Sequence, residues 1–274
     1  MISLDELLTL DERTQILTGS EIRLGRLFQQ ASGRSFIIAL DHGLTLGVPE
    51  GAEDIHLALD RSISGLPDGV LLSPGMARSA AGNFACREAP ALIVRTDFIL
   101  LHPYMDDLGE HYRVLISPAE AAALGADAIT HFLMVGTSNG ELFADNARAV
   151  ASAAQEAHRV GLPLIVEVVL WGSRIKDKKD PDRLAFGCRI AAELGADAIK
   201  TEYTGDASSM AKIVQGCGRP VFVLGGAKGS TQKLLNGTQQ SIDAGARGVI
   251  IGRNIWQADD PAAVSADLRK IIHG

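Results

Sequence analysis

Short apolar runs alternate with longer amphipathic stretches from residue 36 to the end of the chain. The runs are bounded by Gly, Pro or Asp, and most are rich in β-branched residues, which is typical of buried strands. We predict eight strands, over residues 36–41, 69–73, 90–96, 127–135, 163–170, 197–203, 220–226 and 248–252. This strict alternation indicates a parallel sheet covered by helices.

The intervening stretches carry helix signals. We expect helices within residues 52–64, 141–161, 180–195 and 260–274. Gly161 is a helix stop. Asp180 suits an N-cap, and Pro181 suits the first helical position.

A short motif recurs where a helix is expected to lead into a strand. It reads Gly-Ala-Asp-Ala-Ile from Gly125 and from Gly195, and Gly-Ala-Arg-Gly-Val from Gly245. Reuse of one junction among eight even units predicts an α/β fold, a single (β/α)8 TIM barrel formed by one domain over residues 1–274. An open doubly wound sheet is the main alternative. Residues 1–35 are expected to form a helical extension, either a cap on the lower end of the barrel or an oligomer contact.

Length and charge fit this prediction and narrow the partners. The 274 residues are close to the ~250 typical of such a barrel. The net charge is −7 and the basic residues do not gather in one stripe, which argues against nucleic acid as a partner. No run approaches the roughly 18 apolar residues of a membrane span, and the N-terminal segment lacks the pattern of a signal peptide.

Three cysteines lie far apart, without the spacing of metal ligands. We therefore expect a cytoplasmic protein that binds no membrane and needs neither a metal nor another cofactor.

Polar residues interrupt the ends of the predicted strands. In a barrel the active site lies at the C-terminal ends of the strands, so these positions are informative. They are Asp41, His42, Arg95, Asp97, His131, Glu167, Lys200, Glu202, Lys228 and Arg253.

Lys200 is the most informative of these positions. A period of two places Lys200 on the face of its strand opposite the apolar Ile199, so we predict that it points into the barrel. A buried ammonium is costly, and a neutral amine is the form that attacks a carbonyl to give a Schiff base. The alternative is a structural ion pair, for example with Glu167.

Two glycine-containing loops follow the seventh and eighth predicted strands. One contains Gly225, Gly226 and Lys228, and the other contains Gly252 and Arg253. Backbone N–H groups of such loops converge on anions, and this is the usual phosphate site of a barrel. We predict a phosphate site here, with ordinary tight turns as the alternative.

Asp41 and His42 end the first predicted strand. Asp41 could polarise substrate hydroxyls or move protons, and His42 could act as a general acid or base. The plainer alternatives are a turn cap and a satisfied hydrogen-bonding group. We expect Asp41, His131, Glu167 and Lys200 to face inward and to share one proton network, although a lone histidine such as His131 is more often structural.

Four segments resemble the archaeal-type class I aldolases. They are ALDHG (39–43), IKTEYTGD (199–206), VLGGAKG (223–229) and GVIIGRNIWQADDP (248–261). That family includes class I fructose-bisphosphate aldolases, aminodideoxyheptulosonate synthases and a thiolase that acts on a phosphorylated autoinducer derivative. The resemblance covers nearly all of residues 30–274. It implies a small phosphorylated carbonyl substrate and a homo-oligomer, a pentamer or a decamer.

The resemblance also implies roles for single residues. Lys200 matches the Schiff-base lysine of the family and Asp41 its first-strand acidic residue. Residues 225–226 and 252–253 match its phosphate-binding loops. His42 matches a histidine that the thiolase branch uses in proton transfer.

One departure from the family pattern concerns the proton donor. The aldolase branches carry a tyrosine after the fifth strand, whereas this chain reads LWGSRIKDKKD, with Trp171 near that place as a substrate contact. An indole N–H donates hydrogen bonds but does not deliver a proton at neutral pH. His42, Glu167, Tyr203 or a bound water becomes the candidate acid or base.

These observations predict a class I aldolase that forms or cleaves a C–C bond of a phosphorylated keto-sugar or related ketone through Lys200. Two alternatives stay open. One is a thiolase-like acyl transfer from a phosphorylated diketone to coenzyme A. The other is a phosphosugar-binding barrel without catalysis.

Overall fold

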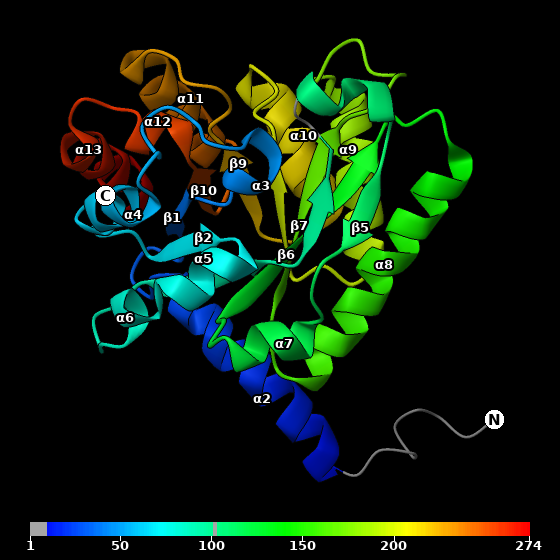
Figure 1. Ribbon diagram of the computed structural model, residues 1–274, viewed down its shortest axis with the longest axis horizontal. Coiled ribbons are helices and arrows are strands. Elements are labelled where there is room, and N and C mark those ends of the chain that lie inside the picture. Colours follow the sequence, from blue (N-terminus) through cyan, green and yellow to red (C-terminus); the bar gives the residue numbers. More distant parts are fainter. Residues whose placement is uncertain (1–9, 101–102) are drawn as a thin grey trace.

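The computed structural model describes residues 10–100 and 103–274. Its centre is a closed barrel of eight parallel strands, adjacent in the order β1-β10-β9-β8-β7-β6-β3-β2 (Figure 1). The strands are β1 (Ser35–Ala39), β2 (Gly69–Leu72), β3 (Ala91–Arg95), β6 (Ala128–Val135), β7 (Leu164–Leu170), β8 (Ala198–Thr201), β9 (Val221–Leu224) and β10 (Gly248–Ile251). Each coincides with a predicted strand, so the predicted (β/α)8 barrel is confirmed.

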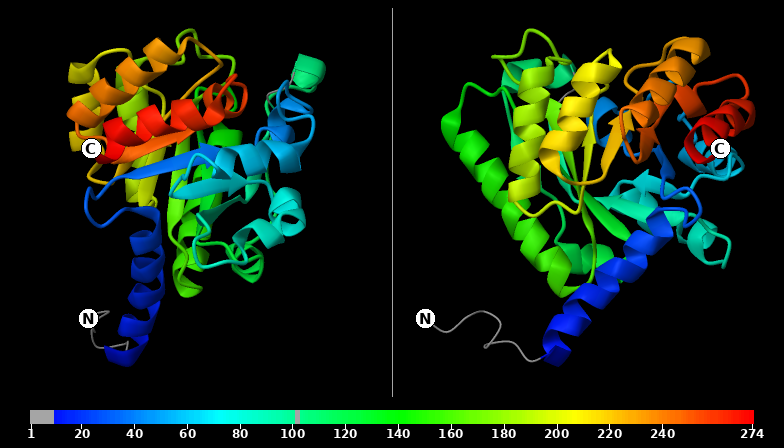
Figure 2. Two further views of the ribbon diagram at one scale, coloured as in Figure 1. Left: turned by 90° about the vertical axis from the view of Figure 1, so that its left-hand side faces the viewer. Right: turned by 180° about the vertical axis from the view of Figure 1, so that it is seen from behind.

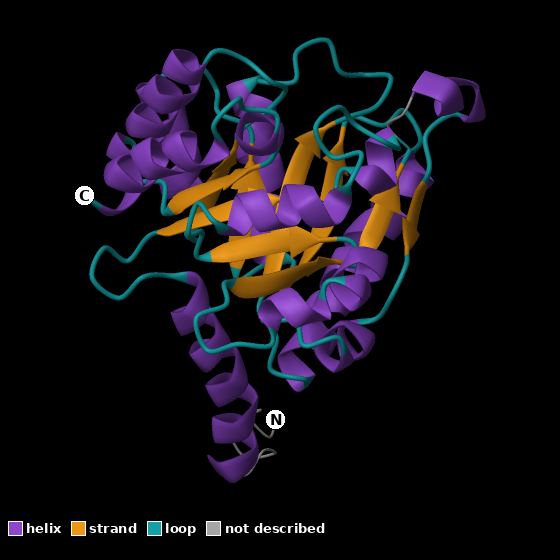
Figure 3. Cartoon of the chain, turned by 60° about the vertical axis from the view of Figure 1, so that its left-hand side comes forward, coloured by secondary structure: helices purple, strands orange, loops and turns teal. Residues whose placement is uncertain are grey.

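Helices surround the barrel on its outer side (Figure 3). They are α2 (Leu10–Leu27), α3 (Gly43–Leu46), α4 (Ile55–Ile63), α5 (Pro74–Ser79), α6 (Ala81–Phe84), α7 (Pro118–Ala123), α8 (Gly140–Arg159), α9 (Pro181–Glu193), α10 (Ala207–Cys217), α11 (Thr231–Asp243), α12 (Arg253–Trp256) and α13 (Pro261–His273). The four predicted helices are α4, α8, α9 and α13. Within the described ranges, none of these helices combines the length and the apolar character that crossing a membrane requires.

The insertion between β3 and β6 was not predicted from the sequence. Between β3 and β6 the chain forms an antiparallel pair, β4 (Asp97–Ile99) and β5 (Tyr112–Val114), with the 3-10 helix η1 (Pro103–Leu108) between them. Strands of three residues are too short to show an alternating pattern. The pair begins at Asp97, two residues after the end of β3, and so places Asp97 at the end of the barrel where the strands have their C-termini.

The recurring helix-to-strand motif has a backbone explanation. Gly125, Gly195 and Gly245 follow α7, α9 and α11 with φ of 86°, 103° and 97°. Only glycine adopts these angles without steric cost, so the motif is a helix stop that turns the chain toward the next strand.

The aspartate of the motif joins neighbouring strands. Asp127 Oδ2 accepts a hydrogen bond from the Leu92 N–H at 2.9 Å, and Asp197 Oδ2 accepts one from the Leu164 N–H at 2.8 Å. Each carboxylate satisfies a backbone donor at the start of the preceding strand, which supports the strand register.

Apolar side chains fill the lower and middle parts of the barrel. They are Ile37, Ala39, Leu71, Ala91, Ile93, Ala128, Ile165, Ala198, Phe222 and Ile250. Because side chains alternate along a strand, the next position on the same face also points inward. On four strands or directly after them that position is charged, namely Asp41, Arg95, Glu167 and Lys200.

Helix α2 closes the lower end of the barrel with its C-terminal turn. Leu27 is fully buried against the inner apolar cluster, and Leu24 and Phe28 pack beside it. The Phe28 ring stacks on Phe222 with ring centroids 5.4 Å apart. The N-terminal part of α2 projects from the body of the molecule (Figure 2). The predicted extension is thus a lower cap within the described residues; residues 1–9 lie outside them.

We predict that Leu27→Ala lowers the free energy of unfolding by about 2–5 kcal/mol, because it opens a cavity beneath the barrel. Urea unfolding measures this change as a shift in midpoint. Ile22→Ala is the matched control, since Ile22 lies on the same helix with 62% of its surface exposed. Its effect should stay within about 0.5 kcal/mol. Equal effects of the two substitutions would contradict a capping role for Leu27.

Candidate active site

A cavity of about 410 Å³ opens at the C-terminal ends of the barrel strands. Most of the site residues predicted from the sequence line it together. They are Asp41, His42, Glu167, Trp171, Lys200, Gly225, Gly226, Gly252 and Arg253. The glycine loops and Lys200 therefore share one site, as expected for a barrel enzyme.

Two predicted site residues lie elsewhere. Tyr203 turns toward α11, where its hydroxyl donates to Gln240 Oε1 and its ring lies beside Gly237. Lys228 is exposed and does not line the cavity. Both follow the end of a strand, where the alternation that orients side chains no longer holds. The structure brings neither residue to the cavity.

Lys200 lies in the wall of the cavity with 5% of its surface exposed. Its Nζ is 2.9 Å from Glu167 Oε2, and the two residues are register partners on β8 and β7. The ion pair that was considered as an alternative is therefore present. It opens onto the cavity, so the amine is paired and also accessible to a ligand.

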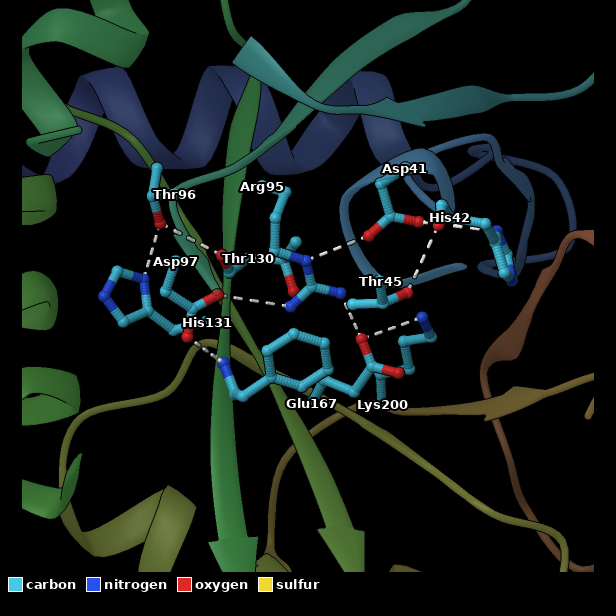
Figure 4. Close-up of polar contacts among 11 residues, drawn as sticks. Asp41, His42, Thr45, Arg95, Thr96, Asp97, Thr130, His131, Glu167 and Lys200 are labelled. Carbon is cyan, nitrogen blue, oxygen red and sulfur yellow. Dashed lines mark hydrogen bonds and ion pairs between the residues drawn. The ribbon is translucent and has the colours of Figure 1, made fainter. Parts of the chain in front are cut away.

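Arg95 is the centre of the polar network (Figure 4). Its Nε donates to Asp41 Oδ2 at 2.9 Å, its Nη1 is 3.5 Å from Asp97 Oδ1, and its Nη2 donates to Glu167 Oε2. The guanidinium carbon lies 3.8 Å from the centroid of the Phe132 ring, a cation–π arrangement. Arg95 was predicted from the sequence to end a strand, but this role was not predicted.

The network sets the charge of the carboxyl groups. Burial alone would raise the pKa of Asp41 and of Glu167, but the neighbouring cations Arg95 and Lys200 outweigh it and lower both pKa values. For Asp97 burial dominates, and its pKa is raised. Asp41 and Glu167 are thus held as carboxylates beside the lysine.

His42 stands at the edge of the same cavity. Its ring meets Trp256 edge-on at 5.6 Å, and its Nδ1 lies 3.8 Å from Asp41 Oδ1. Burial lowers the pKa of His42, which favours the neutral imidazole. A Cβ on Gly252 would come within 2.4 Å of this ring, so a glycine is needed for His42 to occupy its place.

The loop after β9 is fixed by Asn254, a residue that sequence analysis missed. Its Oδ1 accepts from the Gly229 N–H at 2.9 Å, and its Nδ2 donates to the carbonyls of Gly225 and Ala227 at 2.8 and 3.1 Å. The adjacent Arg253 lines the cavity with a buried Nε that has no hydrogen-bond partner in the described structure. These features suit the capture of an anion.

The opposite part of the cavity wall is apolar. Trp171 follows β7 and lines the cavity beside Ile99, Phe132 and Val169. The glycine loops lie on one side of the cavity and the apolar wall on the other, so the cavity is chemically asymmetric.

His131 does not join the network as expected. It lies on the outer face of β6 between Ile129 and Leu133, which pack in the core between strands and helices, and its Nδ1 bonds to Thr96 Oγ1. Apolar residues occupy both faces of the strand, so the sequence pattern does not show which face points into the barrel. The prediction that His131 points inward was wrong. The structural interpretation of this histidine fits its position.

Comparison with known proteins gives a consistent result. The family model described as DeoC/LacD family aldolase matches residues 35–258. An uncharacterised aldolase of Saccharolobus solfataricus is 33% identical over 261 residues, which cover 94% of this chain and 95% of that protein. The 2-amino-3,7-dideoxy-D-threo-hept-6-ulosonate synthase of Halobacterium salinarum is 31% identical over 255 residues, covering 93% of this chain and 92% of that protein.

A solved structure is similar over most of its length. An archaeal fructose-1,6-bisphosphate aldolase, with its catalytic lysine covalently bound to a carbinolamine intermediate, superposes with a TM-score of 0.81 at 26% sequence identity. The match covers 93% of this chain and 100% of that one.

The buried His131 predicts a pH dependence of stability. Because burial lowers the pKa of His131, the unfolded chain takes up a proton first as the pH falls below about 6.5. Stability is therefore present above that pH and is lost below it, by up to about 1.4 kcal/mol per pH unit from this residue. His131→Asn should lose less stability between pH 7.5 and 5.5 than the unmodified protein does, as measured by urea unfolding at each pH.

The exposed His56 provides the control for this measurement. His56→Asn should follow the pH profile of the unmodified protein. A His131→Asn profile parallel to that of the unmodified protein would exclude a neutral, buried His131.

Proposed function

The chain belongs to the DeoC/LacD family of aldolases, and we propose that Lys200 is the residue with which it forms a Schiff base on a phosphorylated ketone. The protein is a class I aldolase, a lyase that works through a lysine imine. The observation that carries the assignment to Lys200 is its place in the barrel. It is buried between Glu167 and the phosphate loops, and its amine opens onto the cavity.

Imine formation follows from the arrangement around Lys200. The neutral amine adds to the ketone carbonyl, and the carbinolamine then loses water with a proton from a neighbouring acid. Glu167 orients the amine through the contact of 2.9 Å. Asp41 and His42 line the same cavity, and His42 is the proposed partner of the oxygen that leaves as water.

The carbon chemistry uses the imine as an electron sink. In the cleavage direction, the electron pair of the breaking C–C bond moves to the iminium and leaves an enamine and an aldehyde. In the reverse direction, the enamine adds to the aldehyde. Arg253 and the glycine loops hold the phosphate, so that binding energy remote from the reacting carbon orients the substrate.

Two finer statements rest on the sequence alone. The homo-oligomeric state and the cytoplasmic location stay predictions. The thiolase-like alternative uses the same lysine and phosphate loops, and the products separate the two reactions. An aldolase releases a free aldehyde without coenzyme A.

We predict that borohydride, added with dihydroxyacetone phosphate, traps a stable adduct on the peptide that contains Lys200. Peptide mapping by mass spectrometry locates it. Lys200→Ala should give no adduct, because the amine that forms the imine is absent. Lys178→Ala is the control, since Lys178 is the other lysine on the described cavity lining. An adduct on Lys178, or none with any phosphorylated ketone, would refute the assignment.

We predict that Arg253→Met raises the KM for dihydroxyacetone phosphate by about 10- to 100-fold, the range expected for losing a hydrogen bond to a charged group. The variant keeps much of the side-chain stem, and the KM for unphosphorylated dihydroxyacetone should not change. Steady-state kinetics measure both values. Lys228→Met is the matched control, because Lys228 is a cation of the neighbouring loop outside the cavity. A larger effect of Lys228→Met would place the phosphate elsewhere.

A further inference from the structure

An aldol step needs a group that takes a proton from the substrate and returns it. Sequence resemblance implies a tyrosine for this role, and the chain has three tyrosines. Tyr104 lies on η1 with 88% of its surface exposed, and Tyr112 is buried outside the cavity lining. Tyr203 turns toward α11. The structure describes all three, and none lines the active-site cavity.

Most ionisable groups that face the cavity already have partners. Asp41 and Glu167 are held by Arg95, and their lowered pKa values make them weak bases and poor acids near neutral pH. Asp97 faces Arg95 on one oxygen and accepts the Phe132 N–H on the other. It is fully buried. His42 and Glu202 remain.

Glu202 occupies a distinctive place. It lies two residues beyond Lys200, roughly 7 Å along the chain direction, just after the end of β8. It lines the main cavity and an adjoining cavity of about 450 Å³ that extends toward Lys233 on α11. Among the described residues, its carboxyl makes no hydrogen bond and no salt bridge, so its oxygens are available to a substrate.

The surroundings of Glu202 suit proton transfer in both directions. Burial raises the pKa of Glu202 and Glu167 adds to this effect, while Lys179, Lys200 and Lys178 oppose it without cancelling it. Arg253 also faces this carboxyl from the loop after β10. A carboxyl whose pKa is shifted toward neutrality is both a better base and a usable acid.

We propose that Glu202 is the catalytic acid and base of the aldol step. It takes the role that a tyrosine has in the aldolase branches and that none of the three tyrosines of this chain is placed to take. The proposal rests on the Schiff base proposed for Lys200. It adds to it the residue that moves the proton at the reacting carbon and hydroxyl.

In the cleavage direction, the Glu202 carboxylate takes the proton of the substrate hydroxyl. The electron pair of that O–H bond becomes the carbonyl bond of the released aldehyde. The C–C bond breaks, and its electron pair forms the enamine and neutralises the iminium nitrogen. The protonated Glu202 then gives its proton to the enamine carbon, and water hydrolyses the resulting imine to free the ketone and Lys200.

His42 is less suited to this role. Burial lowers its pKa, so little imidazolium is present near neutral pH to protonate an enamine carbon. It also follows β1, which β9 and β10 separate from the strand of Lys200 in the barrel order. Its place beside Asp41 fits the loss of water from the carbinolamine.

Deuterium exchange into dihydroxyacetone phosphate tests the proposal, because exchange needs enamine formation but no aldehyde. The protein is incubated with this ketone in D2O, and incorporation is followed by NMR. Glu202→Gln should exchange at least about 100-fold more slowly, in line with the loss of a general acid–base group. Borohydride should still trap the Lys200 adduct in this variant. Formate should partly restore exchange to Glu202→Ala.

Controls separate the possible failures. Glu193→Gln, at an exposed glutamate on the outer face of α9, should exchange at the unmodified rate. An exchange rate of Glu202→Gln within about threefold of the unmodified rate would overturn the proposal. The proposal would also be overturned if His42→Asn lost exchange by about 100-fold while Glu202→Gln did not. Loss of the borohydride adduct in Glu202→Gln would assign Glu202 to imine formation instead. Absence of an adduct in the unmodified protein would refute the Schiff base itself.

Discussion

The site depends on the ion pairs that the buried guanidinium of Arg95 forms with the surrounding carboxyl groups. Arg95 has 2% of its surface exposed and faces Asp41, Asp97 and Glu167. A buried carboxylate without a partner costs several kcal/mol, so these groups could not stand in the upper layer of an apolar barrel without a cation among them. The cations Arg95 and Lys200 lower the pKa values of Asp41 and Glu167, whereas burial raises the pKa of Asp97. Arg95 in this way holds Glu167 against the lysine.

The order of strands around the barrel explains how chemistry and binding adjoin. Lys200 lies on β8 and Glu202 follows it, the glycine loops follow β9 and β10, and Asp41 follows β1. These four strands are consecutive neighbours in the barrel. In the proposed complex, a phosphate held by the loops lies between the amine and the first-strand acid. Asn254 fixes one of these loops with three hydrogen bonds, so the loop is held in place by the protein itself.

Much of this arrangement could be predicted from the sequence because it follows from local patterns. Eight apolar runs predicted the barrel, the period of two predicted the inward Lys200, and two glycine loops predicted part of the cavity wall. Arg95 could not be assigned in this way, because its partners Asp41 and Glu167 lie 54 and 72 residues away along the chain. No local signal records such a pairing. The orientation of His131 was predicted wrongly because apolar residues occupy both faces of its strand.

The most direct measurement is a crystal structure determined from crystals that are soaked in dihydroxyacetone phosphate and then cryo-cooled. The proposed chemistry predicts continuous electron density from Lys200 Nζ to the ketone carbon, with the phosphate against the glycine loops and Arg253. It also predicts that the Glu202 carboxyl lies within hydrogen-bonding distance of the reacting carbon or its hydroxyl. A phosphate bound outside these loops, or a ketone attached to another residue, would contradict it.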